Sequence, residues 1–145
     1  MIRDLAYAHP VLRARFEKLR AIWDESHPRE RLRVTCVWRS PVEQKALWDK
    51  GRVTAGPKVT NCDGSVRMSQ HNYNPSRAID VVVLVEGVGM GADLSKVYVA
   101  TWEIDKYAAL GPLCDEVGLV WGGRFPGLRD APHVELPKDV AQVGG

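Results

Sequence analysis

The sequence predicts an α+β domain in which helices pack on a small, mainly antiparallel sheet that carries a zinc site. The fold class follows from the order of segments: helical periodicity dominates the first part of the chain, and short apolar segments typical of strands come later. The length of 145 residues falls within the range of one compact domain, so residues 1–145 are expected to form a single unit.

The N-terminal part of the chain predicts a helix, a strand and a second helix. Apolar residues recur at helical spacing after His9-Pro10, up to His27-Pro28. They are Leu12, Phe16, Leu19, Ile22 and Trp23. Residues 32–38 alternate and are rich in β-branched side chains, which favours a strand. Ser40-Pro41-Val42-Glu43 has the pattern of a capping box with a proline start, and predicts a helix over residues 41–50 that Gly51 closes.

The remaining segments predict loops, strands and one interrupted helix. Residues 52–70 are polar without a period and indicate a long loop, which is often functional. We expect strands at 77–85, 119–121 and 133–136, a turn at 87–92 and a loop at 122–132. A helix is expected over 102–117, with a kink or break near Gly111-Pro112 and a cap at Gly118.

Composition and charge narrow the classes of partner. The formal net charge is only +2 and no run of Lys and Arg concentrates it, so nucleic acid is not expected, whereas an anionic cell wall remains compatible. The longest apolar segment, residues 79–85, is interrupted by Asp80 and is too short to span a bilayer, so no stable membrane association is expected.

The N-terminal segment and the cysteines indicate the compartment. Residues 1–9 carry an early acid and lack the apolar core of a secretory signal, so synthesis is expected to end in a cytoplasm. Cys36, Cys62 and Cys114 are scattered and form no C-x-x-C pair, which favours buried free thiols over a disulfide framework or a thiolate zinc site.

Asp80 is the first residue that points to a metal. It stands near the beginning of a hydrophobic strand, beside Ile79 and Val81. Burying a carboxylate there is unfavourable unless a cation or hydrogen-bond donors compensate it. A metal ion bound by Asp80 and the loop residue His71 would supply that compensation.

A second cluster lies near the C-terminal end of the sequence. Asp130 precedes His133 by three residues, and Glu135 is expected on the same strand face as His133. Two histidines and one carboxylate are a known ligand set for catalytic zinc, which leaves a fourth position for water and lets a nearby carboxylate accept its proton. The spacing alone equally fits hydrogen-bonded structural polar groups, and no H-E-x-x-H motif decides between these interpretations.

The ordered set of motifs resembles the zinc peptidases that include phage L-alanyl-D-glutamate endopeptidases and bacterial D-alanyl-D-alanine carboxypeptidases. The resemblance covers most of the chain. It rests on the helix after His9-Pro10, on Trp38-Arg39-Ser40 followed by Glu43-Gln44 and Leu47, on Ser69-x-His71 with Ala78-x-Asp80, on Trp121-Gly122-Gly123 and on Asp130-x-x-His133. It implies that His71, Asp80 and His133 bind zinc, that Asp130 is the catalytic carboxylate, and that Arg39 polarises or anchors the substrate.

The resemblance also implies an activity, the cleavage of amide bonds in peptidoglycan stem peptides. We expect a monomeric phage endolysin with L-alanyl-D-glutamate endopeptidase activity that reaches the wall through a membrane lesion. A D-alanyl-D-alanine carboxypeptidase and a non-catalytic, zinc-containing module that binds wall peptides are the alternatives. A hydrolase with a cysteine nucleophile is disfavoured, because no cysteine stands in a recognisable nucleophile motif.

The roles of two residues stay open, and one interval departs from the family pattern. Arg39 would pair with Glu43 on a helix surface if it has no role in catalysis. Glu135 competes with Asp130 for the role of general base. The interval from His71 to Asp80 is about two residues longer than in the phage enzymes, so its central residues, 74–76, are expected to bulge without moving either ligand.

Overall fold

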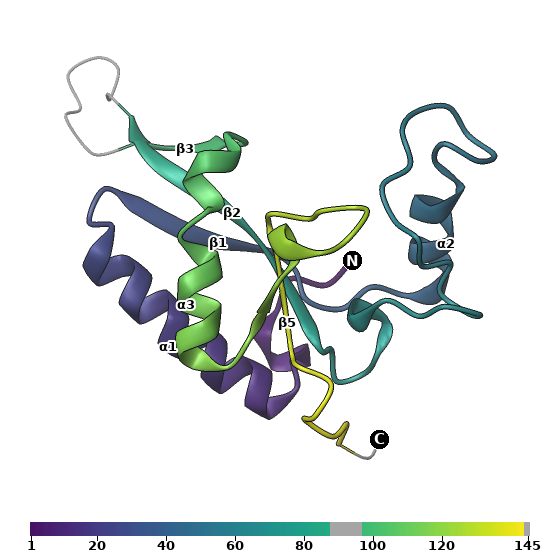
Figure 1. Cartoon of the computed structure of the whole chain (residues 1–145), viewed down its shortest axis with the longest axis horizontal. Coiled ribbons are helices and arrows are strands. Elements are labelled where there is room, and N and C mark those ends of the chain that lie inside the picture. The colour runs from purple at the N-terminus through teal and green to yellow at the C-terminus, as the bar shows by residue number, and fades with distance from the viewer. Residues whose placement is uncertain (88–96, 144–145) are drawn as a thin grey trace.

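A sheet built around one long strand forms the centre of the protein (Figure 1). The computed structural model describes residues 1–87 and 97–143. Within these residues five antiparallel strands run in the order β1-β2-β5-β4, and β3 also pairs with β2. The strands are β1 (Glu30–Cys36), β2 (Ala78–Gly87), β3 (Val97–Thr101), β4 (Val120–Trp121) and β5 (His133–Glu135). The α+β class and the mainly antiparallel sheet are thereby confirmed.

Two of the helices pack together against the sheet, and the third lies apart from them. The described helices are α1 (Pro10–Ser26), α2 (Pro41–Asp49) and α3 (Leu110–Val117), with short 3-10 helices η1 (Leu5–Tyr7), η2 (Gln70–Asn72), η3 (Ile104–Tyr107) and η4 (Gly122–Arg124). Figure 1 shows α1 and α3 close together, while α2 and the loop that follows it project to the other side. We call this projection, residues 41–69, the arm. No described helix is long and apolar enough to cross a membrane.

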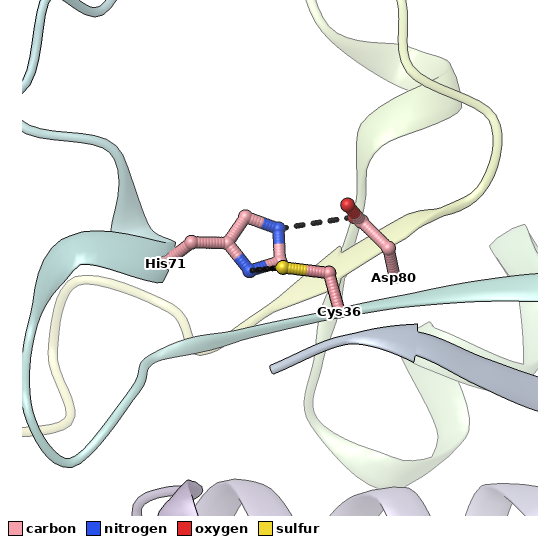
Figure 2. A group of neighbouring side chains, drawn as sticks. All are labelled: Cys36, His71 and Asp80. Carbon is pink, nitrogen blue, oxygen red and sulfur yellow. Dashed lines mark hydrogen bonds and ion pairs between the residues drawn. The ribbon is translucent and has the colours of Figure 1, made fainter. Parts of the chain in front are cut away.

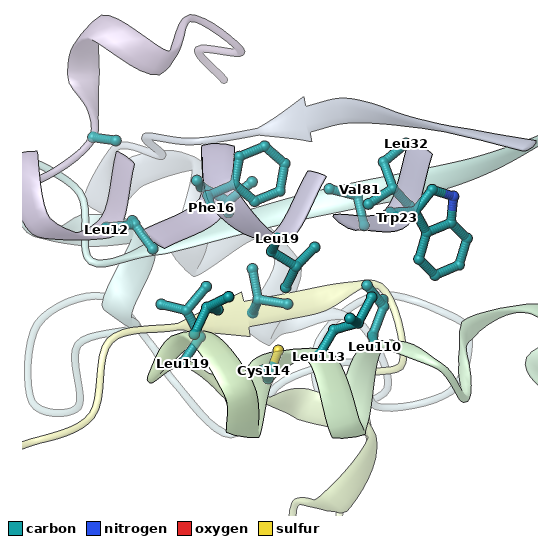
Figure 3. Close-up of a cluster of buried hydrophobic side chains, with 14 of the residues drawn as sticks. Leu12, Phe16, Leu19, Trp23, Leu32, Val81, Leu110, Leu113, Cys114 and Leu119 are labelled. Carbon is teal, nitrogen blue, oxygen red and sulfur yellow. The ribbon is translucent and has the colours of Figure 1, made fainter. Parts of the chain in front are cut away.

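Alternation along β2 separates a core face from a polar face. Ile79, Val81 and Val83 are buried in the core, where they meet the apolar side of α1 and α3 (Figure 3). Asp80 therefore points to the opposite face of the sheet. Each fully buried aliphatic or aromatic side chain contributes about 1.5–3 kcal/mol to folding, so this register is strongly fixed.

A bulge in β1 changes which face its last residues occupy. The register between β1 and β2 shifts between Val34 and Cys36, and Cys36 lies opposite Asp80. Leu32 belongs to the core, and after the shift it is Val37, not Cys36, that enters the core cluster. The bulge thus sends the Cys36 thiol to the polar face, next to Asp80.

Local signals fix the first two helices as predicted. α1 begins after His9, whose Nδ1 accepts from the Val11 amide, and ends at Ser26 before His27-Pro28. The capping box of α2 is confirmed, since Ser40 Oγ accepts from the Glu43 amide at 3.1 Å and Glu43 Oε1 accepts from the Ser40 amide at 3.2 Å. The strand expected over 32–38 lies two residues earlier in the chain.

The helix expected over 102–117 is wrong in its first half. A 3-10 turn, η3, occupies part of it, and the break lies at Ala108–Ala109 instead of Gly111-Pro112. Pro112 is the third residue of α3, where a backbone amide has no intrahelical acceptor, so proline removes no helical hydrogen bond there. Gly118 caps α3 in the left-handed region (φ 83°), as predicted.

The sequence interpretation missed β3. Among the described strands it pairs with β2 alone, and most of its side chains are exposed, so it lacks the alternation of a half-buried strand. The turn expected at 87–92 falls largely outside the described residues, and Gly87 itself is the last residue of β2.

Candidate metal centre

Three segments bring the predicted ligands together on the polar face of the sheet. Asp80 in β2 lies directly opposite His133, the first residue of β5. His71 lies in η2, where Ser69 caps the turn by accepting from the His71 amide at 3.2 Å. Within the interval before Asp80, the Ser76 amide donates to the Tyr7 carbonyl and the Ser76 carbonyl accepts from the His9 amide, so this interval pairs with the N-terminal segment.

The geometry of the three side chains fits a zinc ion. His71 Nε2 lies 3.1 Å from Asp80 Oδ1, His133 Nδ1 lies 3.0 Å from the same oxygen, and the two nitrogens are 3.2 Å apart. In tetrahedral zinc sites with bonds of about 2.0–2.1 Å, neighbouring ligand atoms lie roughly 3.3 Å apart. The donor set and its spacing therefore match a zinc site with one free position.

Second partners orient both imidazoles. His71 Nδ1 lies 2.9 Å from the Val37 carbonyl oxygen, to which it donates, so Nε2 faces Asp80. His133 Nε2 lies 2.7 Å from Glu135 Oε1, which turns Nδ1 toward Asp80. Such contacts fix the tautomer that a metal-binding histidine needs.

Asp80 keeps both histidines charged when no metal is bound. Burial lowers the pKa of His71, but the negative charge of Asp80 outweighs this and raises the pKa to about 10. Burial also lowers the pKa of His133, whereas hydrogen bonds to Asp80 and Glu135 raise it to about 9. Burial raises the pKa of Asp80, yet the charge of His71 and hydrogen bonds from both histidines hold it far below its usual range. Two protons thus occupy the place that a divalent cation would fill.

Asp130 lies at the edge of this cluster. Its Oδ2 is 3.8 Å from His133 Nδ1, and its side chain is half exposed. Partial burial is the largest cause that raises the pKa of Asp130 above its usual value, and the negative charge of Asp80 is the next largest. A carboxylate that is close to the ligand atoms but reachable from solvent is suited to exchange protons with water or substrate.

The Trp121-Gly122 motif positions Asp130 and His133. The Asp130 amide donates to the Gly122 carbonyl at 2.9 Å, and Trp121 Nε1 donates to the Ala131 carbonyl at 2.7 Å. A Cβ at Gly122 would lie 2.3 Å from the Asp130 carbonyl oxygen. Only glycine therefore permits this close approach of the two backbone segments.

Arg39 belongs to the centre and not to the helix surface. It is 9% exposed, and its Nη2 lies 3.5 Å from Asp80 Oδ2 and 3.7 Å from Cys36 Sγ. The alternative pairing with Glu43 is wrong, because Glu43 caps α2 and pairs with the terminal amine. Arg39 thus adds positive charge beside the carboxylate that holds both histidines.

A cleft of about 1110 Å³ gives access to these residues. Arg39, His71, Asp130 and His133 line it, together with residues of the arm and of the segments on either side of β5. The Phe125 ring packs against the His133 ring with a centroid distance of 5.5 Å. The centre is therefore open to an extended ligand on one side and covered by an apolar ring on another.

Comparison with known families agrees with this geometry. A family model described as D-alanyl-D-alanine carboxypeptidase matches residues 63–136, just over half of the chain. The chain belongs to this peptidase family. The matched segment contains His71, Asp80, Asp130 and His133, and Arg39 lies before it. Peptidases of the D-alanyl-D-alanine carboxypeptidase family are zinc enzymes, and the described residues include groups able to hold a metal.

Cys36 is a member of the centre that the sequence interpretation missed. Figure 2 shows one ring nitrogen of His71 joined to Asp80 and the other to Cys36, whose Sγ lies 3.6 Å from His71 Nδ1. Nothing in the sequence signals the bulge that places it there. Cys36 is 1% exposed, which argues against a role as nucleophile in this peptidase family member. Cys36 and Cys114 are free and buried, as predicted, whereas Cys62 is free, half-buried and part of the cleft.

Gln44 is the second residue that was missed. It is fully buried in α2, and its Oε1 accepts from Arg39 Nη1 at 2.9 Å. Its Nε2 donates to the Cys62 carbonyl at 3.1 Å and lies 3.3 Å from Thr60 Oγ1. One side chain therefore connects Arg39 with the part of the arm that lines the cleft.

Replacement of Gln44 by methionine is expected to lower peptidase turnover by about tenfold, because Arg39, the neighbour of Asp80, loses the acceptor that holds it. Loss of a direct partner of a metal ligand costs about 10–100-fold, and Gln44 acts one contact further away. Gln44→Glu is the matched variant, since it still accepts from Arg39 but no longer donates to Cys62. We expect it to retain more turnover than Gln44→Met. Turnover and melting temperature are measured on both. Equal turnover in the two variants at equal folded fractions would show that the contact with Arg39 does not matter.

The metal-free peptidase is expected to lose stability as pH rises. The pKa values of His71 and His133 are raised from 6.5 in the unfolded chain to about 10 and about 9. Stability from these protons is fully present below pH 6.5 and is lost as pH rises through the folded-state values. Zinc bound by these histidines would replace the protons, so protein prepared with zinc is expected to show a smaller decline. Thermal unfolding across this range, with chelator or with zinc, tests the difference; a flat metal-free profile would contradict it.

Proposed function

We propose that this protein is a zinc peptidase that hydrolyses amide bonds in peptidoglycan stem peptides, as an L-alanyl-D-glutamate endopeptidase of the endolysin type. The observation that carries the proposal is the group formed by His71, Asp80 and His133 beside Asp130 in an open cleft. A structural zinc site is closed by four protein ligands, whereas three ligands and a neighbouring carboxylate are typical of catalytic sites.

In this proposal, three residues bind the metal and a fourth transfers protons. His71, Asp80 and His133 would hold the zinc, which supplies Lewis acidity toward the scissile carbonyl and an activated water when it is bound. Asp130 accepts the proton of the attacking water and returns it to the leaving nitrogen, for which its raised pKa is suited.

Arg39 and Glu135 have supporting roles in this proposal. Arg39 lines the cleft with a buried positive charge, which offsets the negative charge that develops on the substrate oxygen. Glu135 accepts from His133 Nε2, on the opposite side of the ring from Nδ1. This position favours Asp130 over Glu135 as the base. We further propose that residues 1–145 act as one monomeric catalytic domain, because one apolar core joins α1, α3 and the sheet.

Digestion of purified peptidoglycan, followed by mass spectrometry of the products, tests the proposal. We expect new amino-terminal D-glutamate, loss of digestion in chelator, and recovery after zinc is added. Digestion that survives exhaustive chelation would contradict a zinc mechanism, and binding without any product would favour the non-catalytic module. The description of the matching family favours D-alanyl-D-alanine carboxypeptidase as a second candidate, for which the released product is free D-alanine.

A further inference from the structure

Positively charged residues that are far apart in the sequence line the same cleft. Four of its lining residues are exposed cations from distant parts of the chain: Lys58, Arg67, Arg129 and Lys138. No ion pair joins any of these side chains to another described residue. The whole chain carries a formal charge of only +2, so the cleft holds a concentration of unpaired positive charge that its composition does not suggest.

The carboxylates in the same lining do not neutralise these cations. They are Asp130, which lies beside the predicted metal ligands, and Glu135, which is occupied by His133. The four cations therefore remain available to a ligand that enters the cleft.

The four cations come from two separate parts of the lining, the arm and the segments that flank β5, which we call the two walls of the cleft. Lys58 and Arg67 belong to the arm, whereas Arg129 and Lys138 lie in the segments before and after β5. A ligand extended along the cleft would pass between two positively charged walls. An elongated ligand with several negative groups matches this arrangement better than one compact anion.

The local backbone that presents Arg67 is well defined. Asp63 Oδ1 accepts from the Ser65 amide at 3.0 Å and from the Arg67 amide at 2.9 Å. The Gly64 amide donates to the Arg67 carbonyl at 3.1 Å, and a Cβ at Gly64 would lie 2.8 Å from the Pro41 carbonyl oxygen, so the turn packs directly on α2. Arg67 is thus presented by a closed turn.

The backbone beside Lys138 is held in a similar way. Arg77 Nη2 donates to the Pro137 carbonyl at 3.1 Å, and the Val140 amide donates to the same carbonyl at 3.2 Å. The side chain of Lys138 therefore extends from a turn that is attached to the start of β2.

We infer that this cleft selects stem peptides whose carboxylates are free and discriminates against peptides in which they are amidated; the inference rests on the proposed function. In an L-alanyl-γ-D-glutamyl peptide, the α-carboxylate of glutamate is next to the scissile amide, and the following residue can carry another. Amidation removes one negative charge from each group at almost unchanged size. The cations distinguish the two forms by charge alone.

Equilibrium binding of two synthetic peptides tests this selection. One peptide has free carboxylates, the other has carboxamides at the same positions, and both are titrated into zinc-loaded Asp130→Asn protein to prevent turnover. We expect the amidated peptide to bind about fivefold more weakly for each carboxylate, the upper range for exposed ion pairs. The difference in affinity is expected to be lost as the ionic strength is raised from about 0.01 M to about 1 M, because the Debye length falls from about 30 Å to about 3 Å.

Variants that lack the cations of one wall test whether those cations cause the selection. Lys58→Gln/Arg67→Gln and Arg129→Gln/Lys138→Gln each remove the charge of one wall, and at least one is expected to reduce the preference for the free peptide. Lys18→Gln/Arg33→Gln removes two exposed cations outside the cleft and serves as the matched control. Selectivity that is unchanged in both wall variants would overturn the inference.

Hydrolysis by the wild-type protein separates this inference from the proposed function. Equal affinity for both peptides, with efficient hydrolysis of both, would overturn the selection and leave the proposed function intact. Preferential binding of the free peptide without hydrolysis would support the selection and overturn the peptidase assignment. A phosphate polymer that displaces the free peptide at equal charge concentration would show a general anion site and would also overturn the selection.

Discussion

Replacement of Asp130 by asparagine is expected to lower the turnover of wall peptides by on the order of a hundredfold or more, while zinc binding and folding persist. The amide nearly preserves the shape of the carboxylate but cannot accept the proton of the attacking water. Asp130 lies 3.8 Å from His133 Nδ1 and is half exposed, so its loss leaves the three proposed ligands in place. Rates of wall lysis and zinc content by elemental analysis are the measurements.

Glu135→Gln is the matched control for this variant. Glu135 is bonded to the outer nitrogen of His133, so its replacement is expected to have a smaller effect on turnover, through the orientation of the ring. An inactive Glu135→Gln protein together with an active Asp130→Asn protein would transfer the role of base to Glu135.

Replacement of His133 by alanine is expected to remove zinc and activity together. The side chain supplies one of the three proposed ligand atoms and is the direct cross-strand neighbour of Asp80. Zinc content after dialysis and the rate of wall lysis are measured in parallel. His27→Ala, which alters a histidine that stacks on Trp23 outside the cleft, serves as the control and is expected to retain the metal. Full zinc occupancy and activity in His133→Ala would mean that the ligand set is different.

The fold was predictable where local chemistry is strong. The capping box at Ser40 and Glu43, the left-handed Gly118 and the apolar segment around Asp80 each act within a few residues and fix their elements without distant help. β3 and the break at Ala108–Ala109 depend on packing against other segments, which periodicity does not encode.

The residues of the candidate site could be singled out from the sequence, their surroundings less so. Asp80 stands out because a carboxylate beside apolar strand residues needs a partner, and the resemblance to zinc peptidases implied His71, His133 and Asp130 as its neighbours. Cys36 joins them only through a bulge in β1, and Gln44 only because α2 packs beneath the arm. The four cations of the cleft meet through tertiary structure from positions that are separated by as many as 80 residues, so no local pattern reveals them.

The pairing of β5 with β2 also determines when the centre can exist. His133 follows Asp80 by 53 residues, and their contact forms only when β5 has aligned beside β2. A ribosome that adds roughly 5–20 residues per second exposes Asp80 seconds before His133 emerges. During that interval the nascent chain has an incomplete set of metal ligands and, on the proposed mechanism, no hydrolytic capacity. On the proposed mechanism, hydrolytic capacity is therefore acquired only after β5, a strand of three residues, has been synthesised and has paired with β2.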